Sequence, residues 1–207
     1  MKTLLVIDVQ NDFIPGGSLP VPNGNNIVPV INSIQDKFDL IVATQDWHPK
    51  AHSSFAVNHE GKSDFESIDW RGQMQTLWPE HCVQGSKGAE LHPELDTTKY
   101  EAIFRKGTDI NIDSYSAFYD NNHLKATGLT GYLKEKEVTK LYFCGLASDI
   151  CVYFSIRDAI QEGFECYFIE DASKPLDLEA FETIKIKMVA MGVHIITSES
   201  IFLCLNK

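Results

Sequence analysis

The chain has 207 residues, of which 43% are hydrophobic and 23% charged, values that suit one globular domain with a sizeable core. A formal net charge of −11, with scattered lysines and arginines, argues against nucleic acid or an anionic membrane surface as a partner. No apolar run is long enough to span a membrane, and no signal peptide is recognisable. Five irregularly spaced cysteines fit a reducing compartment, so we expect a cytoplasmic protein.

Segments typical of strands alternate with segments typical of helices. Apolar runs of strand length occur at 4–9, 40–44, 100–105, 138–144, 166–169 and 193–197. Apolar residues recur at helical spacing at 27–34, 124–136, 149–162 and 178–191, with the second of these segments interrupted around Gly128 and Gly131. This alternation predicts an α/β fold with three layers, α/β/α, around a six-stranded, mainly parallel sheet.

The segment from about residue 46 to 95 shows no strong helix or strand pattern. It is rich in His, Trp, Pro, Gly and Ser, and loops of this length inside a domain are usually functional. We therefore expect residues 1–207 to form a single domain in which this long loop region carries binding residues.

Several reactive side chains lie where predicted strands end. Asp8, Asp46, Lys106 and Cys151 all fall at the carboxyl edge of the sheet, where such folds bind ligands. A helix start would favour the thiolate of Cys151. Asp8 could accept the thiol proton, and Lys106 could stabilise both anions. Taken singly, these residues also suit a buried thiol, a turn carboxylate and a surface lysine.

A metal site is a second possibility. Asp46 and His48 are two residues apart, so in an extended segment they project to the same side and could bind one ion. The residues alone leave the third ligand open among His81, His52, His59 and the softer Cys82.

Four blocks of sequence resemble the nicotinamidases of the isochorismatase-like cysteine hydrolases. They are LVIDVQNDF at 5–13, TQDWHP at 44–49, LWPEHCVQG at 77–85 and CGLASDICV at 144–152. Lys106-Gly107 and DSYSAF at 113–118 also fit, and the blocks follow the family's order over nearly the whole chain. The second and third blocks are specific to the nicotinamidase branch.

The resemblance implies a fold, a reaction and a set of residues. The fold is that of the isochorismatase-like hydrolases, and the reaction is hydrolysis of nicotinamide to nicotinate and ammonia through a cysteine thioester, in NAD salvage. The implied catalytic residues are Asp8, Lys106 and Cys151. The implied metal ligands are Asp46, His48 and His81, and the implied substrate-binding residues are Phe13, Trp78, Tyr115 and Ala147.

Further expectations follow from the same resemblance. It implies one divalent ion, with Zn²⁺ expected first and Fe²⁺ or Mn²⁺ as alternatives, and a cis peptide before Ala147 that directs the N–H groups of Ala147 and Cys151 at the amide oxygen. Pyrazinamide is a plausible second substrate. His52 matches an additional ligand of some relatives only with altered spacing, so its role stays open. So do the oligomeric state, with a homo-oligomer included, and two other functions: hydrolysis of carbamoyl or ureido substrates, or metal binding without catalysis.

Overall fold

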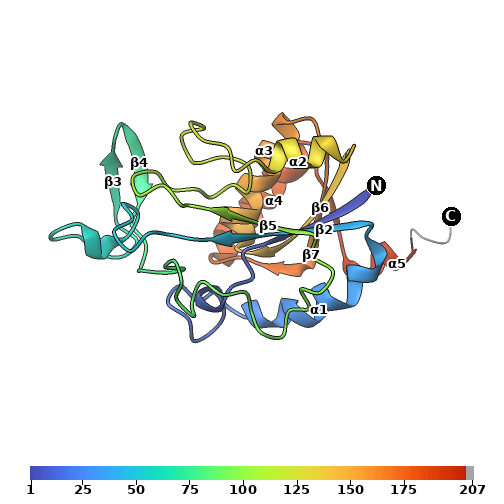
Figure 1. The fold of residues 1–207 in the computed structure, drawn as a ribbon, viewed down its shortest axis with the longest axis horizontal. Helices are drawn as coiled ribbons and strands as arrows, with labels where there is room; N and C mark the ends of the chain where they lie inside the picture. Colours follow the sequence, from blue (N-terminus) through green and yellow to red (C-terminus); the bar gives the residue numbers. More distant parts are fainter. Residues whose placement is uncertain (204–207) are drawn as a thin grey trace.

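A six-stranded parallel sheet forms the centre of the computed structural model, which describes residues 1–203 (Figure 1). Its strands are β1 (Lys2–Ile7), β2 (Leu40–Asp46), β5 (Ala102–Lys106), β6 (Lys140–Leu146), β7 (Glu165–Lys174) and β8 (His194–Ile196). They lie in the order β5-β2-β1-β6-β7-β8, and neighbouring strands are parallel. The predicted α/β class is confirmed. The order reverses between β1 and β6, which makes the carboxyl ends of these two strands the expected ligand position.

Helices cover both faces of the sheet. One face carries α1 (Ile27–Ile34) and α5 (Ser198–Leu203), and the other carries α2 (Leu129–Glu135), α3 (Tyr153–Gln161) and α4 (Leu178–Ala190) (Figure 1). β1 shows why the strands are apolar throughout: Leu4 and Val6 pack with α1, whereas Leu5 and Ile7 pack with the helices opposite. No helix among residues 1–203 has the length and apolar character needed to cross a bilayer.

Five short helical turns lie between these elements. Four are 3₁₀ turns: η1 (Asn11–Phe13), η2 (Gly24–Asn26), η3 (Gln35–Lys37) and η4 (Ala56–Asn58). The fifth, η5 (Ser148–Val152), is a π turn that leads from β6 into α3.

The region from 46 to 95 contains a hairpin that the sequence pattern does not predict. Strands β3 (Ser67–Trp70) and β4 (Gln73–Thr76) pair antiparallel and project at the end of the molecule away from the N-terminus (Figure 1). Arg71 and Gly72 connect them with φ of 55° and 80°, as a two-residue hairpin turn requires. The strands are mostly polar, and all of their residues except Gln75 are exposed or half-buried, so they give no strong apolar signal.

Helix α2 begins later than predicted, at Leu129 rather than at residue 124. Gly128 precedes it with φ of 94°, outside the helical region. Before that, the Asp120 carboxylate accepts hydrogen bonds from the backbone N–H groups of Asn122, Leu124 and Lys125. Residues 120–125 therefore form a turn closed by the Asp120 carboxylate, and the helix starts only after Gly128.

The strands also differ from prediction at their ends. β1 stops at Ile7, two residues early, because Asp8 has φ of 47°. β7 runs five residues further than predicted, to Lys174, and rejoins β6 after a shift in register. Helix α5 is not predicted at all.

Candidate active site and metal centre

Three of the predicted residues lie together at the carboxyl edge of the sheet. Asp8 directly follows β1, Lys106 is the last residue of β5, and Cys151 lies in the π turn η5 after β6. Each of the three side chains is at most 7% exposed. Because the strands are parallel, residues more than a hundred positions apart meet at one point.

Lys106 is at the centre of this group. Its Nζ lies 2.9 Å from Asp8 Oδ2, pairs with Asp46 Oδ1, and donates to Cys151 Sγ at 3.6 Å. It also donates to the carbonyl of Ser114 at 2.8 Å. One buried cation therefore contacts two carboxylates and a thiol.

The environment of Cys151 favours the thiol over the thiolate. Burial raises the pKa of Cys151 well above its usual value, and the nearby Lys106 ammonium only partly opposes this. The helix-start effect expected from the sequence is outweighed, and the residue lies in a π turn rather than in the first α-helical turn. Burial also raises the pKa of Asp8, to about 6, against the opposing charge of Lys106. Above that pH, Asp8 is an ionised base beside a protonated thiol.

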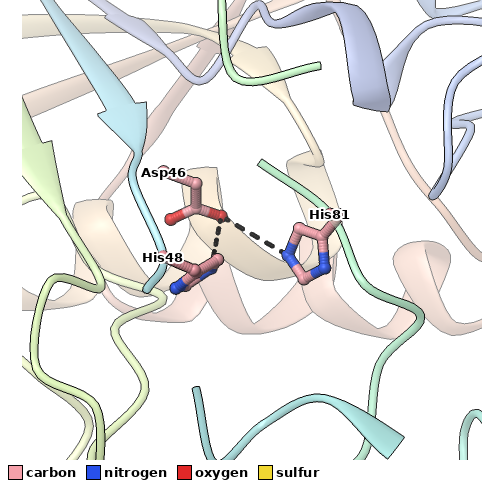
Figure 2. A group of neighbouring side chains, drawn as sticks. All are labelled: Asp46, His48 and His81. Atoms are coloured by element: carbon pink, nitrogen blue, oxygen red, sulfur yellow. Dashed lines mark ion pairs between the residues drawn. The ribbon is translucent and has the colours of Figure 1, made fainter. Parts of the chain in front are cut away.

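A second cluster consists of Asp46, His48 and His81, as Figure 2 shows. Asp46 Oδ2 lies 3.6 Å from His48 Nε2 and 3.9 Å from His81 Nε2. The other ring nitrogens are engaged, since Nδ1 of His48 lies 2.9 Å from the carbonyl oxygen of Gly107 and Nδ1 of His81 lies 2.7 Å from that of Pro79. When Nδ1–H donates to these carbonyls, both Nε2 atoms present lone pairs toward the carboxylate.

The chemistry of this cluster fits a divalent metal ion. Burial and the neighbouring His48 lower the pKa of His81 to about 4, so its imidazole is neutral at pH 7. Burial disfavours the Asp46 carboxylate, but Lys106 outweighs it and lowers the pKa of Asp46. At His48 the same carboxylate outweighs burial and raises the pKa, so a proton competes with a metal ion for its Nε2. One carboxylate and two imidazole nitrogens are a common ligand set for first-row ions.

His52 lies beside this cluster without joining it. It is fully buried, its Nδ1 is 2.7 Å from the hydroxyl of Ser54, and its ring centroid is 4.3 Å from that of His48. Its possible ligand group is a different one, formed with His48 and Asp113. Burial and His48 lower the pKa of His52 to about 4, which keeps it neutral.

Residues of both clusters line one pocket. It is lined by Phe13, Leu19, Val21, Asp46, Trp78, His81, Asp113, Tyr115, Ala147, Ile150, Cys151 and Leu176. All four residues predicted to bind substrate are therefore in its wall. Trp78 Nε1 donates to the hydroxyl of Tyr115 at 3.2 Å, and the peptide bond between Leu146 and Ala147 is cis.

Two buried residues that the sequence analysis did not single out support these clusters. The side-chain amide of Gln10 bonds the backbone N–H and carbonyl of Asp46, both at 2.8 Å. Thr44 bonds Asp8. Thr44 lies two residues before Asp46 on β2, so strand alternation alone indicates that both side chains leave the same face.

Comparisons with known proteins agree with this geometry. A family model for the isochorismatase domain matches residues 2–200. A nicotinamidase of Acinetobacter baylyi is 47% identical over 199 residues, covering 96% of this chain and 93% of the relative. The structure of an Acinetobacter baumanii nicotinamidase and pyrazinamidase superposes with a TM-score of 0.94 at 46% identity, covering 96% and 97% of the two chains. A Pyrococcus horikoshii pyrazinamidase in complex with zinc has a TM-score of 0.78 at 36% identity, covering 95% and 98%.

Proposed function

The chain belongs to the isochorismatase family, and we propose that it acts as a nicotinamidase, hydrolysing nicotinamide to nicotinate and ammonia. The observation that carries the proposal is the shared pocket, whose wall includes the Cys151 thiol and the metal-ligand candidates Asp46 and His81. A substrate with a ring nitrogen and a carboxamide could engage both clusters at once. The named activities of the relatives support the same substrate.

The aromatic residues of the pocket would hold the pyridine ring. Phe13 and Trp78 offer ring faces for stacking, and Tyr115, hydrogen-bonded to Trp78, closes the same wall. This leaves the carboxamide to be oriented at Cys151 and Ala147.

Asp8 would begin the reaction as a general base. It takes the thiol proton of Cys151 as Sγ attacks the carboxamide carbon. The backbone N–H groups of Ala147 and Cys151 donate to the oxyanion that forms, an interaction worth about 3 to 4 kcal/mol per donor in acyl transfer. Lys106 remains protonated throughout, since Asp46 and Asp8 outweigh burial and raise its pKa.

Asp8 would then return its proton. The carbon–nitrogen bond breaks as the proton passes to the amide nitrogen, which leaves as ammonia and gives a thioester on Cys151. Asp8 next takes a proton from water, whose oxygen attacks the thioester carbon. Nicotinate is released, and the proton on Asp8 returns to the sulfur.

Asp46, His48 and His81 would hold one divalent metal ion, which we propose to be zinc. The zinc complex of the Pyrococcus relative supports this choice, and Fe²⁺ or Mn²⁺ suits the same ligands. When bound, the ion supplies a Lewis acid for the pyridine nitrogen and draws electron density from the carboxamide carbon. Lys106 keeps Asp46 ionised for this task.

The proposal extends to the metabolic role of the reaction, a second substrate and the location of the protein. The reaction is a step of NAD salvage, and pyrazinamide, which shares the ring nitrogen and the carboxamide, is a second substrate. A cytoplasmic location agrees with the free thiols of Cys82, Cys144, Cys151 and Cys166.

Ammonia release from nicotinamide tests the function directly. We expect the purified protein loaded with Zn²⁺ to release one ammonia per nicotinate formed, and Cys151→Ala to release none. Carbamoyl and ureido compounds, assayed in parallel, should give no ammonia. Turnover of these compounds without turnover of nicotinamide would contradict the proposal.

A further inference from the structure

Thr44 contacts the Asp8 base at two points. Its hydroxyl donates to Asp8 Oδ1 at 2.6 Å, and its oxygen accepts from the Asp8 backbone N–H at 3.2 Å. Both residues are fully buried, so water does not compete for these bonds. A hydroxyl has one proton to donate, and here it is committed to the carboxylate.

Thr44 and Lys106 contact different carboxylate oxygens of Asp8. Oδ1 carries the bond from Thr44, and Oδ2 lies 2.9 Å from Lys106 Nζ. The carboxylate is also within 4.8 Å of Cys151 Sγ. The carboxylate is therefore held on one side by a hydroxyl and on the other by an ammonium, next to the thiol.

The backbone at Asp8 also needs support. Its φ of 47° lies in the left-handed region, which few residues other than glycine adopt. The hydrogen bond from the Asp8 N–H to Thr44 holds the residue in that conformation, just after β1 ends. Strand β2 presents Thr44 and Asp46 from the same face, so one strand serves both the base and the metal cluster.

We propose that Thr44 is a positioning residue for the general base: its hydroxyl holds Oδ1 of Asp8 and leaves Oδ2 to receive the proton of Cys151. The inference rests on the proposed function for the identity of the substrate. It predicts a loss in the chemical step rather than in substrate binding, because Thr44 does not line the pocket.

Three substitutions separate the hydroxyl from the rest of the side chain. Thr44→Ser keeps the hydroxyl, Thr44→Val keeps the shape, and Thr44→Ala differs from Thr44→Ser by the hydroxyl alone. Thr3 of β1 offers a matched control, since it is equally buried and its hydroxyl has no hydrogen-bond partner within residues 1–203. Thr3→Val therefore removes a buried hydroxyl of the same sheet without touching Asp8.

We expect Thr44→Val and Thr44→Ala to lower kcat by about tenfold or more, a part of the roughly 10²- to 10⁴-fold that a general base supplies. KM for nicotinamide should stay within about twofold, Thr44→Ser should restore most of kcat, and Thr3→Val should match the wild type. An unchanged kcat in Thr44→Ala, a Thr44→Ser as slow as Thr44→Ala, or a loss confined to KM would overturn the inference.

Alkylation of Cys151 by iodoacetamide gives a readout that needs no substrate. Followed by mass spectrometry of the peptide that contains Cys151, the rate should fall in Thr44→Val and Thr44→Ala and recover in Thr44→Ser. A wild-type protein that fails to hydrolyse nicotinamide would refute the proposed function, whereas equal alkylation rates in all variants would refute the role of Thr44.

Discussion

Asp46 and Lys106 are register partners on the adjacent parallel strands β2 and β5, and their side chains form a buried ion pair. The same ammonium lies 2.9 Å from Asp8 Oδ2. One cation thus joins the proposed proton acceptor to a proposed metal ligand. Because all three groups are buried, water cannot replace the charge of the lysine. A substitution that alters this charge should therefore change the electrostatics of both clusters.

Replacing Lys106 should damage stability and activity together. Lys106→Met leaves two buried carboxylates without their shared cation, and breaking a buried pair in this way costs about 3–5 kcal/mol in free energy of unfolding. We also expect kcat/KM for nicotinamide to fall by about a hundredfold or more, because Asp8 is then protonated over a wider pH range. Urea unfolding and ammonia release measure the two effects.

A surface lysine provides the control for this substitution. Lys99 pairs with Asp36 at an exposed position, and exposed pairs contribute about 0–1 kcal/mol. Lys99→Met should therefore leave both measurements near the wild-type values. Equal effects of Lys99→Met and Lys106→Met would contradict the coupling between the two clusters.

The two carboxylates that pair with Lys106, those of Asp46 and Asp8, should have different functions. Asp46→Asn removes a proposed metal ligand, so metal content measured by elemental analysis should fall well below one ion per chain. Asp8→Asn removes the proton acceptor, so it should keep the metal and lose turnover. Each variant serves as the control of the other. Full metal content in Asp46→Asn, or normal turnover in Asp8→Asn, would contradict these assignments.

Activity should decline on the acid side near pH 6. Asp8 must be ionised to take the thiol proton, and burial raises its pKa from 3.8 to about 6. In metal-loaded enzyme, kcat/KM should therefore fall tenfold per pH unit below about pH 6. Bound metal is measured at each pH, because protonation of His48 would release it. A decline that begins only near pH 4, with metal retained, would show that Asp8 is not the acceptor.

Stability has to be measured beside activity, because buried groups with raised and lowered pKa values both titrate over this pH range. A carboxyl with a raised pKa binds its proton more tightly in the folded state, so the contribution of Asp8 to stability increases as pH falls from 6 to 4. The lowered pKa of Asp46 acts in the opposite direction only at lower pH, but the pKa values of His52 and His81, lowered to about 4, remove stability as pH falls from 6.5 toward 4. Circular dichroism melting at pH 5 therefore accompanies the activity assay, and a protein that is still folded at that pH attributes the lost activity to Asp8.

The sequence predicts the layered fold well because the strands are buried on both faces. Continuous apolar runs such as the one before Asp8 have few alternatives to a central parallel strand, and the helices between them follow. The hairpin β3–β4 is different: its residues are mostly polar and mostly exposed or half-buried, and the φ angles of Arg71 and Gly72, not an apolar pattern, determine its turn. Local backbone geometry of this kind leaves little trace in composition.

The sequence predicts which residues form the site better than it predicts their protonation states. Asp8, Lys106 and Cys151 lie at or just after the carboxyl ends of β1, β5 and β6, and parallel topology brings such residues to one edge of the sheet. The protonation of Cys151 depends on burial, which the sequence does not give, and burial outweighs the expected helix-start effect. The resemblance to the nicotinamidases, and not the residues alone, implies His81 as the third metal ligand. Neither spacing nor residue type separates His81 from His52.

These two histidines make a matched pair for the last prediction. Both are buried, and burial with the neighbouring His48 lowers the pKa of each to about 4. Of the two, His81 directs Nε2 at Asp46, at 3.9 Å, whereas the ring of His52 lies tilted against that of His48 and is not grouped with Asp46. His52→Phe keeps a ring in that contact, so we expect it to retain one metal ion per chain and most of the activity. His81→Phe should lose the metal and raise KM for nicotinamide by about tenfold or more, because loss of one ligand removes the anchor for the pyridine nitrogen. Elemental analysis of the two variants checks this directly, and a His52→Phe protein without metal would make His52 a ligand.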